Sequence, residues 1–274
     1  MKNTSGSTDW MYYISTVWED EGDKRLAHYP FMQSGPWTVL LMIASYLYFV
    51  KSGGPRMMQD RKPLPIKDLM IAYNFLMVLV SAWMFYEGCV FLNFGLDAWG
   101  CARADYTSED LSTRRFLFVA WLFFFTKLVE FADTVFMVLR KRYDMISNLH
   151  IIHHSSVPIS VWLGIKFAPV GVNAWFPLLN SFVHSIMYAY YGLSALQESL
   201  GPEAVRQLRH FKPWITRLQI FQFCLAIVHV VVAAVQKNCS SQFPQSFFIL
   251  NTGNAVLFLG LFFNFYRKCY RKAE

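Results

Sequence analysis

Three histidines stand together at the start of one apolar segment, in the sequence LHIIHHSSVP of residues 149–158. His150, His153 and His154 are spaced i, i+3 and i+4, so an α-helix would place them on one face. Ionisable rings at the mouth of a membrane span are costly and by default indicate a functional site rather than a packing cluster. The chemistry that three such imidazoles support is metal binding or acyl transfer.

A second set of reactive residues lies in the preceding apolar segment. The sequence KLVEFADTVFMVLRKR of residues 127–142 carries Lys127, Glu130, Asp133 and Thr134 at helical spacing. These four positions form one polar stripe on a helix. The stripe either binds a substrate or only holds helices together, because polar groups in membranes also make interhelical contacts. The two roles can coexist.

Two later segments also carry polar residues at helical spacing. In the sequence NSFVHSIMYAYYG of residues 180–192, four polar residues share one helix face, namely Asn180, His184, Tyr188 and Tyr191. The sequence TRLQIFQF repeats polar residues at steps of three, at Thr216, Gln219 and Gln222. The second pattern is a weak signal by itself, whereas the histidine of the first lies among hydroxyls and an amide that can fix its tautomer.

The composition indicates a membrane protein. The chain has 274 residues, of which 55% are hydrophobic, 18% aromatic and only 16% charged. It is too apolar for an ordinary soluble domain. Runs of roughly 20 mostly apolar residues are each long enough to cross a hydrocarbon core of about 30 Å. The predicted fold is all-α, a polytopic bundle of seven transmembrane helices at residues 31–50, 69–92, 116–139, 149–167, 172–191, 215–235 and 247–266.

Lysine and arginine predict how these helices are oriented. Fifteen of the 25 lie in loops 51–68, 140–148 and 192–214 and in the C-terminal tail, so these parts should face the cytosol. The N-terminus is then lumenal and the C-terminus cytosolic. This divides the chain into a lumenal segment 1–30 without an evident removable signal peptide, a seven-span domain 31–266 and a basic tail 267–274. The net charge of +7 follows from this anchoring rather than from nucleic-acid binding.

With this orientation, the polar residues of four segments converge on the cytosolic half of the bundle. At 1.5 Å per residue, they lie roughly 6 to 14 Å below the cytosolic ends of their segments. The lumenal halves of the same segments are almost purely apolar. We therefore expect a polar chamber open to the cytosol and an apolar, aromatic-walled pocket beyond it, a shape that suits an amphiphile with a polar head and a long tail.

Two cysteines test the orientation. Cys101 and Cys239 both fall in loops predicted to be lumenal, where an oxidising compartment permits a disulfide, and we predict that they are bonded. Asn3 and Asn238 each begin an Asn-x-Ser/Thr sequence. Of the two, we expect only Asn3 to accept a glycan, because Asn238 lies close to the membrane.

Two other classes of protein share features with this chain. A di-iron lipid desaturase or hydroxylase is one, because HxxHH is a familiar spacing at membrane iron sites, but filling two coordination shells takes about eight imidazoles. The chain has seven histidines, of which His28 is predicted to be lumenal and His229 lies deep in the sixth segment. A seven-span lipid-binding receptor or transporter is the other, and it leaves the histidine cluster without a role.

Four motifs resemble those of the very-long-chain fatty acid elongases, the ELO-type 3-oxoacyl-CoA synthases. They are KLVEFADT at 127–134, HIIHH at 150–154, NSFVHSIMYAYY at 180–191 and TRLQIFQF at 216–223. GPRMM at 54–58, RKP at 61–63 and the pair Tyr73-Asn74 add to a resemblance that covers about residues 54–266. One position departs from the pattern, because many members have Gln five residues before the first motif histidine, where this chain has Met145.

The resemblance implies the condensing step of fatty acid elongation, in which a long-chain acyl-CoA and malonyl-CoA give 3-oxoacyl-CoA, CO2 and CoA. It implies no metal and no redox cofactor. It further implies seven spans around an acyl tunnel in the endoplasmic reticulum membrane, a lumenal disulfide like the pair Cys101 and Cys239, and a homodimer working beside a ketoreductase, a dehydratase and an enoyl reductase. The C-terminal Arg271 and Lys272 loosely resemble a dibasic retrieval signal.

The resemblance also suggests roles for individual residues. It places the family's covalent histidine at His153, whose imidazole can form an acyl-imidazole. We expect His184 to face it across the chamber, positioning the second substrate or handling a proton, and His150 and His154 to orient the site. Substrate binding is expected from Lys127, Glu130, Asp133, Thr134, Asn180, Tyr188, Tyr191, Gln219, Gln222, Arg140 and Lys141.

Three of these expectations leave alternatives open. Asn180 or Gln222 can donate to a developing oxyanion. The cytosolic cations Arg140, Lys141, Arg142, Arg209 and Lys212 suit CoA phosphates but equally explain the topology. Cys224 lies near the depth of the chamber in the sixth segment, and a thiol is a competing nucleophile that only the direction of its side chain can exclude.

Overall fold

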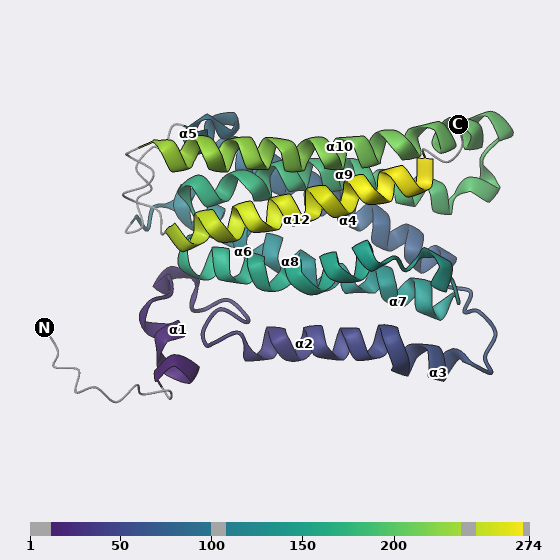
Figure 1. Ribbon diagram of the computed structural model, residues 1–274, viewed down its shortest axis with the longest axis horizontal. Helices are drawn as coiled ribbons and strands as arrows, with labels where there is room; N and C mark the ends of the chain where they lie inside the picture. Colours follow the sequence, from purple (N-terminus) through teal and green to yellow (C-terminus); the bar gives the residue numbers. More distant parts are fainter. Residues whose placement is uncertain (1–11, 100–107, 237–244, 271–274) are drawn as a thin grey trace, which may run out of the picture.

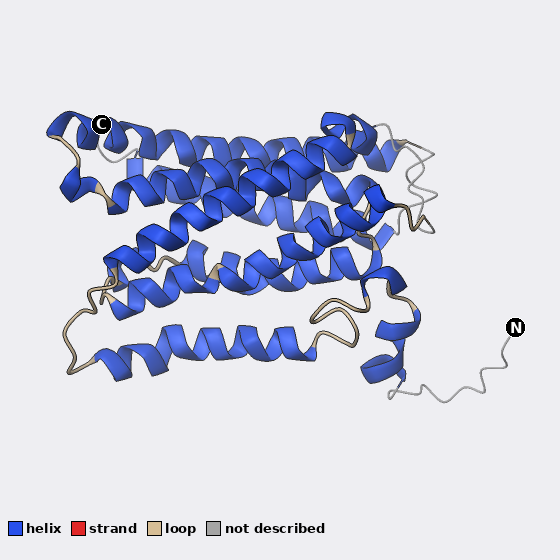
Figure 2. Cartoon of the chain, turned by 180° about the vertical axis from the view of Figure 1, so that it is seen from behind, coloured by secondary structure: helices blue, strands red, loops and turns tan. Residues whose placement is uncertain are grey.

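The computed structural model describes residues 12–99, 108–236 and 245–270, and in these ranges the regular elements are all helices (Figure 2). Long helices run roughly along the longest dimension of the molecule (Figure 1). They are α2 (Trp37–Tyr48), α4 (Lys67–Phe91), α6 (Leu111–Val129), α7 (Phe131–Leu139), α8 (Asn148–Phe167), α9 (Trp175–Ala195), α10 (Pro202–Val235) and α12 (Gln245–Tyr270). Each apolar segment predicted from the sequence therefore contains a helix.

Shorter helical pieces link the long helices. α2 continues through a π-helical turn, η3 (Phe49–Gly53), into α3 (Gly54–Met58). The other short pieces are η1 (Tyr12–Thr16), α1 (Val17–Asp20), η2 (Lys24–Leu26), η4 (Asn93–Gly95), α5 (Leu96–Trp99), η5 (Tyr143–Met145), η6 (Gly171–Ala174) and η7 (Gln197–Ser199). The closest helix pairs are α4 with α9 and α10 with α12.

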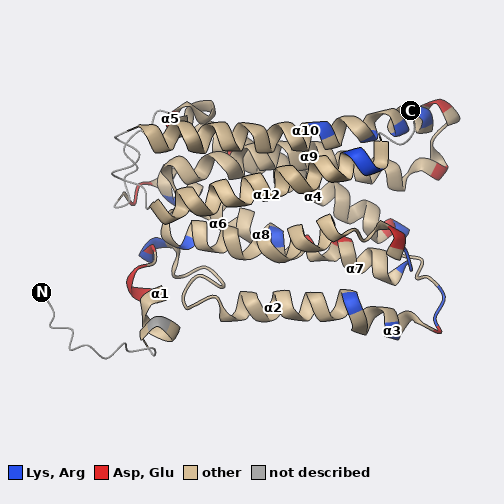
Figure 3. Cartoon of the chain, viewed as in Figure 1, with Lys and Arg blue, Asp and Glu red and all other residues tan. Residues whose placement is uncertain are grey.

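Three of the described helices are long and apolar enough, by length and composition, to cross a membrane: α4, α10 and α12. Charged residues lie mainly toward the ends of the long helices, and few lie along the middle of the bundle (Figure 3). The interior is apolar and aromatic, with Phe123, Phe124 and Trp162 among its fully buried side chains. This distribution is that of a polytopic membrane protein.

The sixth segment begins earlier than the sequence predicted. Residues 192–214 were expected to be a loop, but α10 already starts at Pro202 and runs without interruption to Val235. Pro202 occupies the first turn, where a missing N–H costs nothing, and Glu203 beside it complements the positive end of the helix dipole. The residues that follow are mostly good helix formers, so the apolar span is extended by a polar helical stretch.

The segment before α2 packs against α8. The Trp18 and Trp162 ring centroids are 5.7 Å apart, and Trp162 Nε1 donates to the carbonyl oxygen of Phe31 at 2.8 Å. The buried Lys166 ammonium donates to the carbonyl oxygens of Met32 and Gln33. This segment therefore belongs to the folded body and fixes one end of α8.

Gly95 provides a test of the turn that precedes α5. Its φ is +89°, and a Cβ there would overlap the Trp175 ring and come within 3.2 Å of Leu178 Cδ2. Gly95→Ala should therefore lower the free energy of unfolding by about 1–3 kcal/mol, because it combines a strained φ with a steric overlap. Thermal unfolding in detergent measures this. The control is Gly260→Ala, which meets open space within α12, and an equal loss in both variants would contradict the account.

Candidate active site

A buried cluster of polar side chains joins α6 to α9. Lys127 Nζ donates to Glu130 Oε1 at 2.7 Å and to Asn180 Oδ1 at 3.0 Å, and it lies 3.5 Å from Nδ1 of His184. The same His184 nitrogen is 3.2 Å from Glu130 Oε1. The Lys127 and Glu130 side chains are only 3% and 2% exposed. The pair is therefore desolvated, and removing either partner would leave the other as an uncompensated buried charge.

Glu130 lies at a break in the third predicted segment, which the structure divides into α6 and α7. Its backbone N–H donates to Thr126 O at 2.8 Å, and its carbonyl oxygen accepts from the N–H of Asp133 at 3.2 Å. The residue thus ends one helix and caps the next. Its carboxylate sits beside the positive end of α7, which favours a negative charge there.

A second hydrogen-bonded chain connects α2, α7 and α8. The hydroxyls of Tyr46 and Thr134 are 3.0 Å apart, and Thr134 Oγ1 is 2.7 Å from His150 Nε2. The His150 ring in turn lies 4.3 Å, centroid to centroid, from the ring of His154. This series of hydrogen bonds fixes the first turn of α8, the helix that carries the three histidines. The Ser147 side chain also caps that turn by accepting a hydrogen bond from the His150 N–H.

Asp133 and Tyr188 form a third contact, which joins α7 to α9. The Tyr188 hydroxyl donates to Asp133 Oδ2 at 2.8 Å, and the Tyr188 ring packs edge-on to His184 and Tyr191. Tyr188 is fully buried, whereas Tyr191 is 41% exposed. The polar stripe of α6 and α7 is therefore satisfied in large part by residues of α9.

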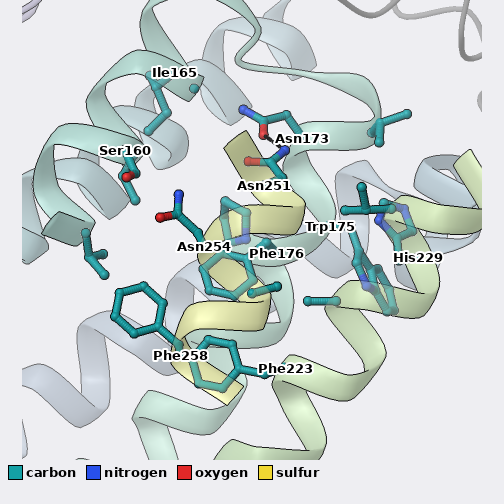
Figure 4. Close-up of a pocket in the computed structure, with 18 of the residues that line it drawn as sticks. Ser160, Ile165, Asn173, Trp175, Phe176, Phe223, His229, Asn251, Asn254 and Phe258 are labelled. Carbon is teal, nitrogen blue, oxygen red and sulfur yellow. Dashed lines mark hydrogen bonds between the residues drawn. The ribbon is translucent and has the colours of Figure 1, made fainter. Parts of the chain in front are cut away.

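His153 lines an apolar pocket whose empty space, including the part open to solvent, is about 790 Å³. Residues of α8, α9, α10, η6 and α12 line this cavity (Figure 4). The His153 ring centroid lies 5.1 Å from that of Phe258 and 5.3 Å from that of His154. His153 is thus placed at the boundary between the polar cluster and a space shaped for an apolar chain.

Three further residues expected at the site have these contacts. His184 Nδ1 lies 3.5 Å from Lys127 Nζ and 3.2 Å from Glu130 Oε1, and no hydrogen bond or ring stacking joins His184 to His153 in the described residues. Gln219 Nε2 donates to Met187 Sδ at 3.4 Å. Gln222 is buried, and its side-chain carbonyl oxygen has no hydrogen-bond partner among the described residues. Neither glutamine lines the cavity.

The competing thiol points outward. Cys224 is exposed on the surface of α10, whereas the adjacent Phe223 is 3% exposed and lines the cavity. Successive residues on a helix point in different directions. The direction of its side chain therefore excludes Cys224 as the nucleophile of this chamber.

The cationic residues after α7 hold the neighbouring chain segments. Arg140 Nη1 donates to Met70 Sδ at 3.5 Å, and Lys141 Nζ donates to the carbonyl oxygen of Gln59 at 2.9 Å. Arg142 makes two contacts of 3.1 Å with the carboxylate of Asp144, which lower the pKa of that carboxyl below its usual value. These contacts order the connection that leads into α8.

The structure also reveals polar residues that sequence reasoning did not assign to a site. Tyr46 contacts Thr134 from α2, and no motif marks it. Ser160, Asn173, Asn251 and Asn254 line the cavity. The spacing i and i+3 of the two asparagines within the apolar run of α12 was a usable signal, because polar residues in a membrane span are by default functional.

The Thr134 bridge predicts a specific effect of substitution. Thr134→Val keeps the shape but removes the hydroxyl that joins Tyr46 to His150, so any activity that depends on the histidine helix should fall about tenfold, the order expected for one neutral hydrogen bond. The kcat of the variant measures this. Tyr46→Phe, which leaves the contact of Thr134 with His150 intact, should cost less, and the opposite ranking would contradict the role of the bridge.

The arrangement of the histidine and carboxylate side chains does not favour a di-iron desaturase or hydroxylase. In the described part of the chain, no group of three or more His, Cys, Asp or Glu side chains is placed to hold a metal ion. His150 is hydrogen-bonded to Thr134, and His184 lies beside the Lys127 ammonium, which repels a cation. The predicted pair Cys101 and Cys239, the glycosylation position Asn3 and the dibasic pair Arg271 and Lys272 lie outside the described residues.

Comparison with known proteins assigns the family. The ELO family model, described as the GNS1/SUR4 family, matches residues 31–274. The "Very long chain fatty acid elongase 7" of Drosophila melanogaster is 38% identical over 97% of this chain and 79% of its own length. The "Very long chain fatty acid elongase 1" of Homo sapiens is 37% identical over 92% of this chain and 88% of its own length. The chain therefore belongs to the ELO family.

Proposed function

We propose that this protein is the condensing enzyme of fatty acid elongation, a very-long-chain 3-oxoacyl-CoA synthase. It would join a long-chain acyl-CoA to malonyl-CoA and release 3-oxoacyl-CoA, CO2 and CoA. The observation that carries the proposal is the position of His153, between a buried polar cluster and an apolar pocket. The related proteins are very long chain fatty acid elongases, which supports the same reaction.

In the first step, the His153 imidazole attacks the thioester carbonyl of the acyl-CoA. A bond forms between the ring nitrogen and the acyl carbon, and the carbon–sulfur bond breaks. CoA leaves as a thiolate and takes the proton that the acylated ring loses from its other nitrogen, which gives free CoA and a neutral acyl-imidazole. The acyl tail would lie in the cavity among α8, α9, α10 and α12. Asn180 or Gln222 would donate to the oxyanion, although neither lines the cavity.

In the second step, malonyl-CoA loses CO2, and the enolate that results attacks the acyl carbon. The new carbon–carbon bond forms as the bond to the His153 nitrogen breaks, and the departing ring takes one proton from solvent, which regenerates the neutral imidazole. His184, held by Lys127 and Glu130, would position the malonyl group or handle a proton. The polar chamber would be completed by Tyr188, Tyr191, Asp133, Thr134 and Gln219. The CoA phosphates would be contacted by Arg140 and Lys141.

We infer the surroundings of the enzyme from the same resemblance. Seven segments would cross the endoplasmic reticulum membrane, with the N-terminal segment 1–30 in the lumen and the basic tail 267–274 in the cytosol. Cys101 and Cys239 would form a lumenal disulfide. The enzyme would act as a homodimer beside a ketoreductase, a dehydratase and an enoyl reductase, and its two steps use neither a metal nor a redox cofactor.

The direct test is a product assay on the purified protein. A panel of saturated and unsaturated acyl-CoAs is incubated with and without malonyl-CoA, and products are identified by mass spectrometry. We expect a 3-oxoacyl-CoA two carbons longer than the substrate, formed only when malonyl-CoA is present. If no acyl-CoA gives this product, while acyl-CoAs still bind, the lipid-binding receptor or transporter becomes the better interpretation.

A further inference from the structure

The cavity wall becomes polar beyond the aromatic rings next to His153. Phe258 contacts His153 and lies 5.7 Å, centroid to centroid, from Phe223. One helical turn beyond Phe258 on α12 stands Asn254, and α8 contributes Ser160. Figure 4 shows these two polar side chains projecting from their helices at the cavity. A tunnel that binds only an unsubstituted hydrocarbon chain needs neither the Asn254 amide nor the Ser160 hydroxyl, because such a chain forms no hydrogen bonds.

The Asn254 side chain makes no hydrogen bond to any described residue, so its two amide N–H donors and its carbonyl acceptor have no partner there. Ser160 Oγ donates to the Ser156 carbonyl oxygen at 3.0 Å, which leaves its lone pairs to accept. By contrast, Asn173 and Asn251 are bonded to one another at 3.0 Å. Among the asparagines of the wall, Asn254 is therefore the one whose side chain has no hydrogen-bond partner in the described residues and can be satisfied by a ligand.

We propose that Asn254 and Ser160 recognise a hydroxyl group carried partway along the acyl chain, an inference that rests on the proposed function. Hydroxyacyl-CoAs are then the preferred substrates. A hydroxyl both donates and accepts, so it can pair with the Asn254 carbonyl or Ser160 Oγ and with the Asn254 amide at once. An unsubstituted chain leaves the amide desolvated and unpaired. A site that binds a hydroxyl in this way discriminates strongly against an analogue that lacks it.

The helices also set the position of the hydroxyl. Ser160 lies seven residues beyond His153 on α8, which is about 11 Å along the helix at 1.5 Å per residue. Asn254 lies four residues from Phe258 on α12, which is about 6 Å from the level at which the Phe258 ring contacts His153. An extended chain advances about 1.2 Å per bond, a third of the reach of one extended residue. The hydroxyl is therefore expected between about the fifth and ninth carbons of the acyl chain.

A hydroxyl scan tests this proposal. Acyl-CoAs of one length, each with a single hydroxyl at successive carbons, are compared with the unsubstituted chain by kcat/KM in the wild type, in Asn254→Leu and in Asn264→Leu. Asn264 is the matched control, since it is an exposed asparagine on the same helix. We expect the hydroxyl at the predicted carbons to raise kcat/KM about tenfold in the wild type and in Asn264→Leu, and to give no advantage in Asn254→Leu.

Two results would overturn the proposal. One is a preference of the wild type for the unsubstituted chain at every hydroxyl position. The other is a hydroxyl advantage that Asn254→Leu leaves unchanged. Efficient elongation of unsubstituted chains in either case would leave the proposed reaction standing, so the two ideas fail separately. If no acyl-CoA is elongated, the proposed function fails, and the hydroxyl site stands only if the hydroxylated acyl-CoA raises Tm more than the plain one and Asn254→Leu removes that difference.

Discussion

His153→Ala should abolish turnover, with a loss of at least about a thousandfold in kcat, because it removes the group that forms the covalent bond to the acyl chain. The fold should survive, since His153 makes ring contacts with Phe258 and His154 but no hydrogen bond to a described residue. Thermal unfolding shows whether the variant is folded, and the product assay measures turnover.

His210→Ala is the matched control for this loss. His210 is exposed on the polar first part of α10 and lies outside the cavity, so its removal should leave kcat within about twofold of the wild type, as expected of a surface substitution. A folded His153→Ala that keeps more than a tenth of wild-type turnover would contradict the role given to His153. Loss of activity in Cys224→Ala would point instead to the thiol.

Lys127→Met should destabilise the protein by about 3–5 kcal/mol, because it leaves the Glu130 carboxylate buried without its partner. The Lys127 side chain is only 3% exposed, and its ammonium contacts Glu130 and Asn180. The double variant Lys127→Met with Glu130→Gln removes both charges and should lose less than the single variant. Unfolding in mixed detergent micelles measures the three free energies.

The control for this prediction is an exposed ion pair of similar length. Lys67 Nζ lies 2.6 Å from Glu198 Oε2, but the Glu198 side chain is 77% exposed. Lys67→Met should therefore change stability by no more than about 1 kcal/mol, since solvent screens such a pair. The account would be contradicted if Lys127→Met cost no more than Lys67→Met, or if the double variant were the least stable of all.

The helices and the polar cluster follow largely from sequence periodicity. Lys127, Glu130 and Asp133 share a helix face by spacing alone, as do Asn180, His184 and Tyr188. Two helices that each bury polar groups in an apolar surrounding must satisfy them against one another. The contacts from Lys127 to Asn180 and from Tyr188 to Asp133 are that outcome.

Other parts of the site depend on packing between distant segments and could not be read from the sequence. Spacing does not show that the helix breaks at Glu130, or that Tyr46 of α2 reaches Thr134. The outward direction of Cys224 depends on how α10 is rotated against its neighbours. Spacing also placed His153 and His184 at one level without showing that one faces the cavity and the other the ion pair.

The most direct test of the central claim is to look for the acyl group on His153 itself. The purified protein is incubated with a long-chain acyl-CoA without malonyl-CoA, and the adduct is located by peptide mass spectrometry. We predict one acyl group on His153, release of free CoA, and transfer of that group to 3-oxoacyl-CoA when malonyl-CoA is added. An enzyme that forms 3-oxoacyl-CoA but never carries acyl on His153, or carries it on another residue, would contradict the account.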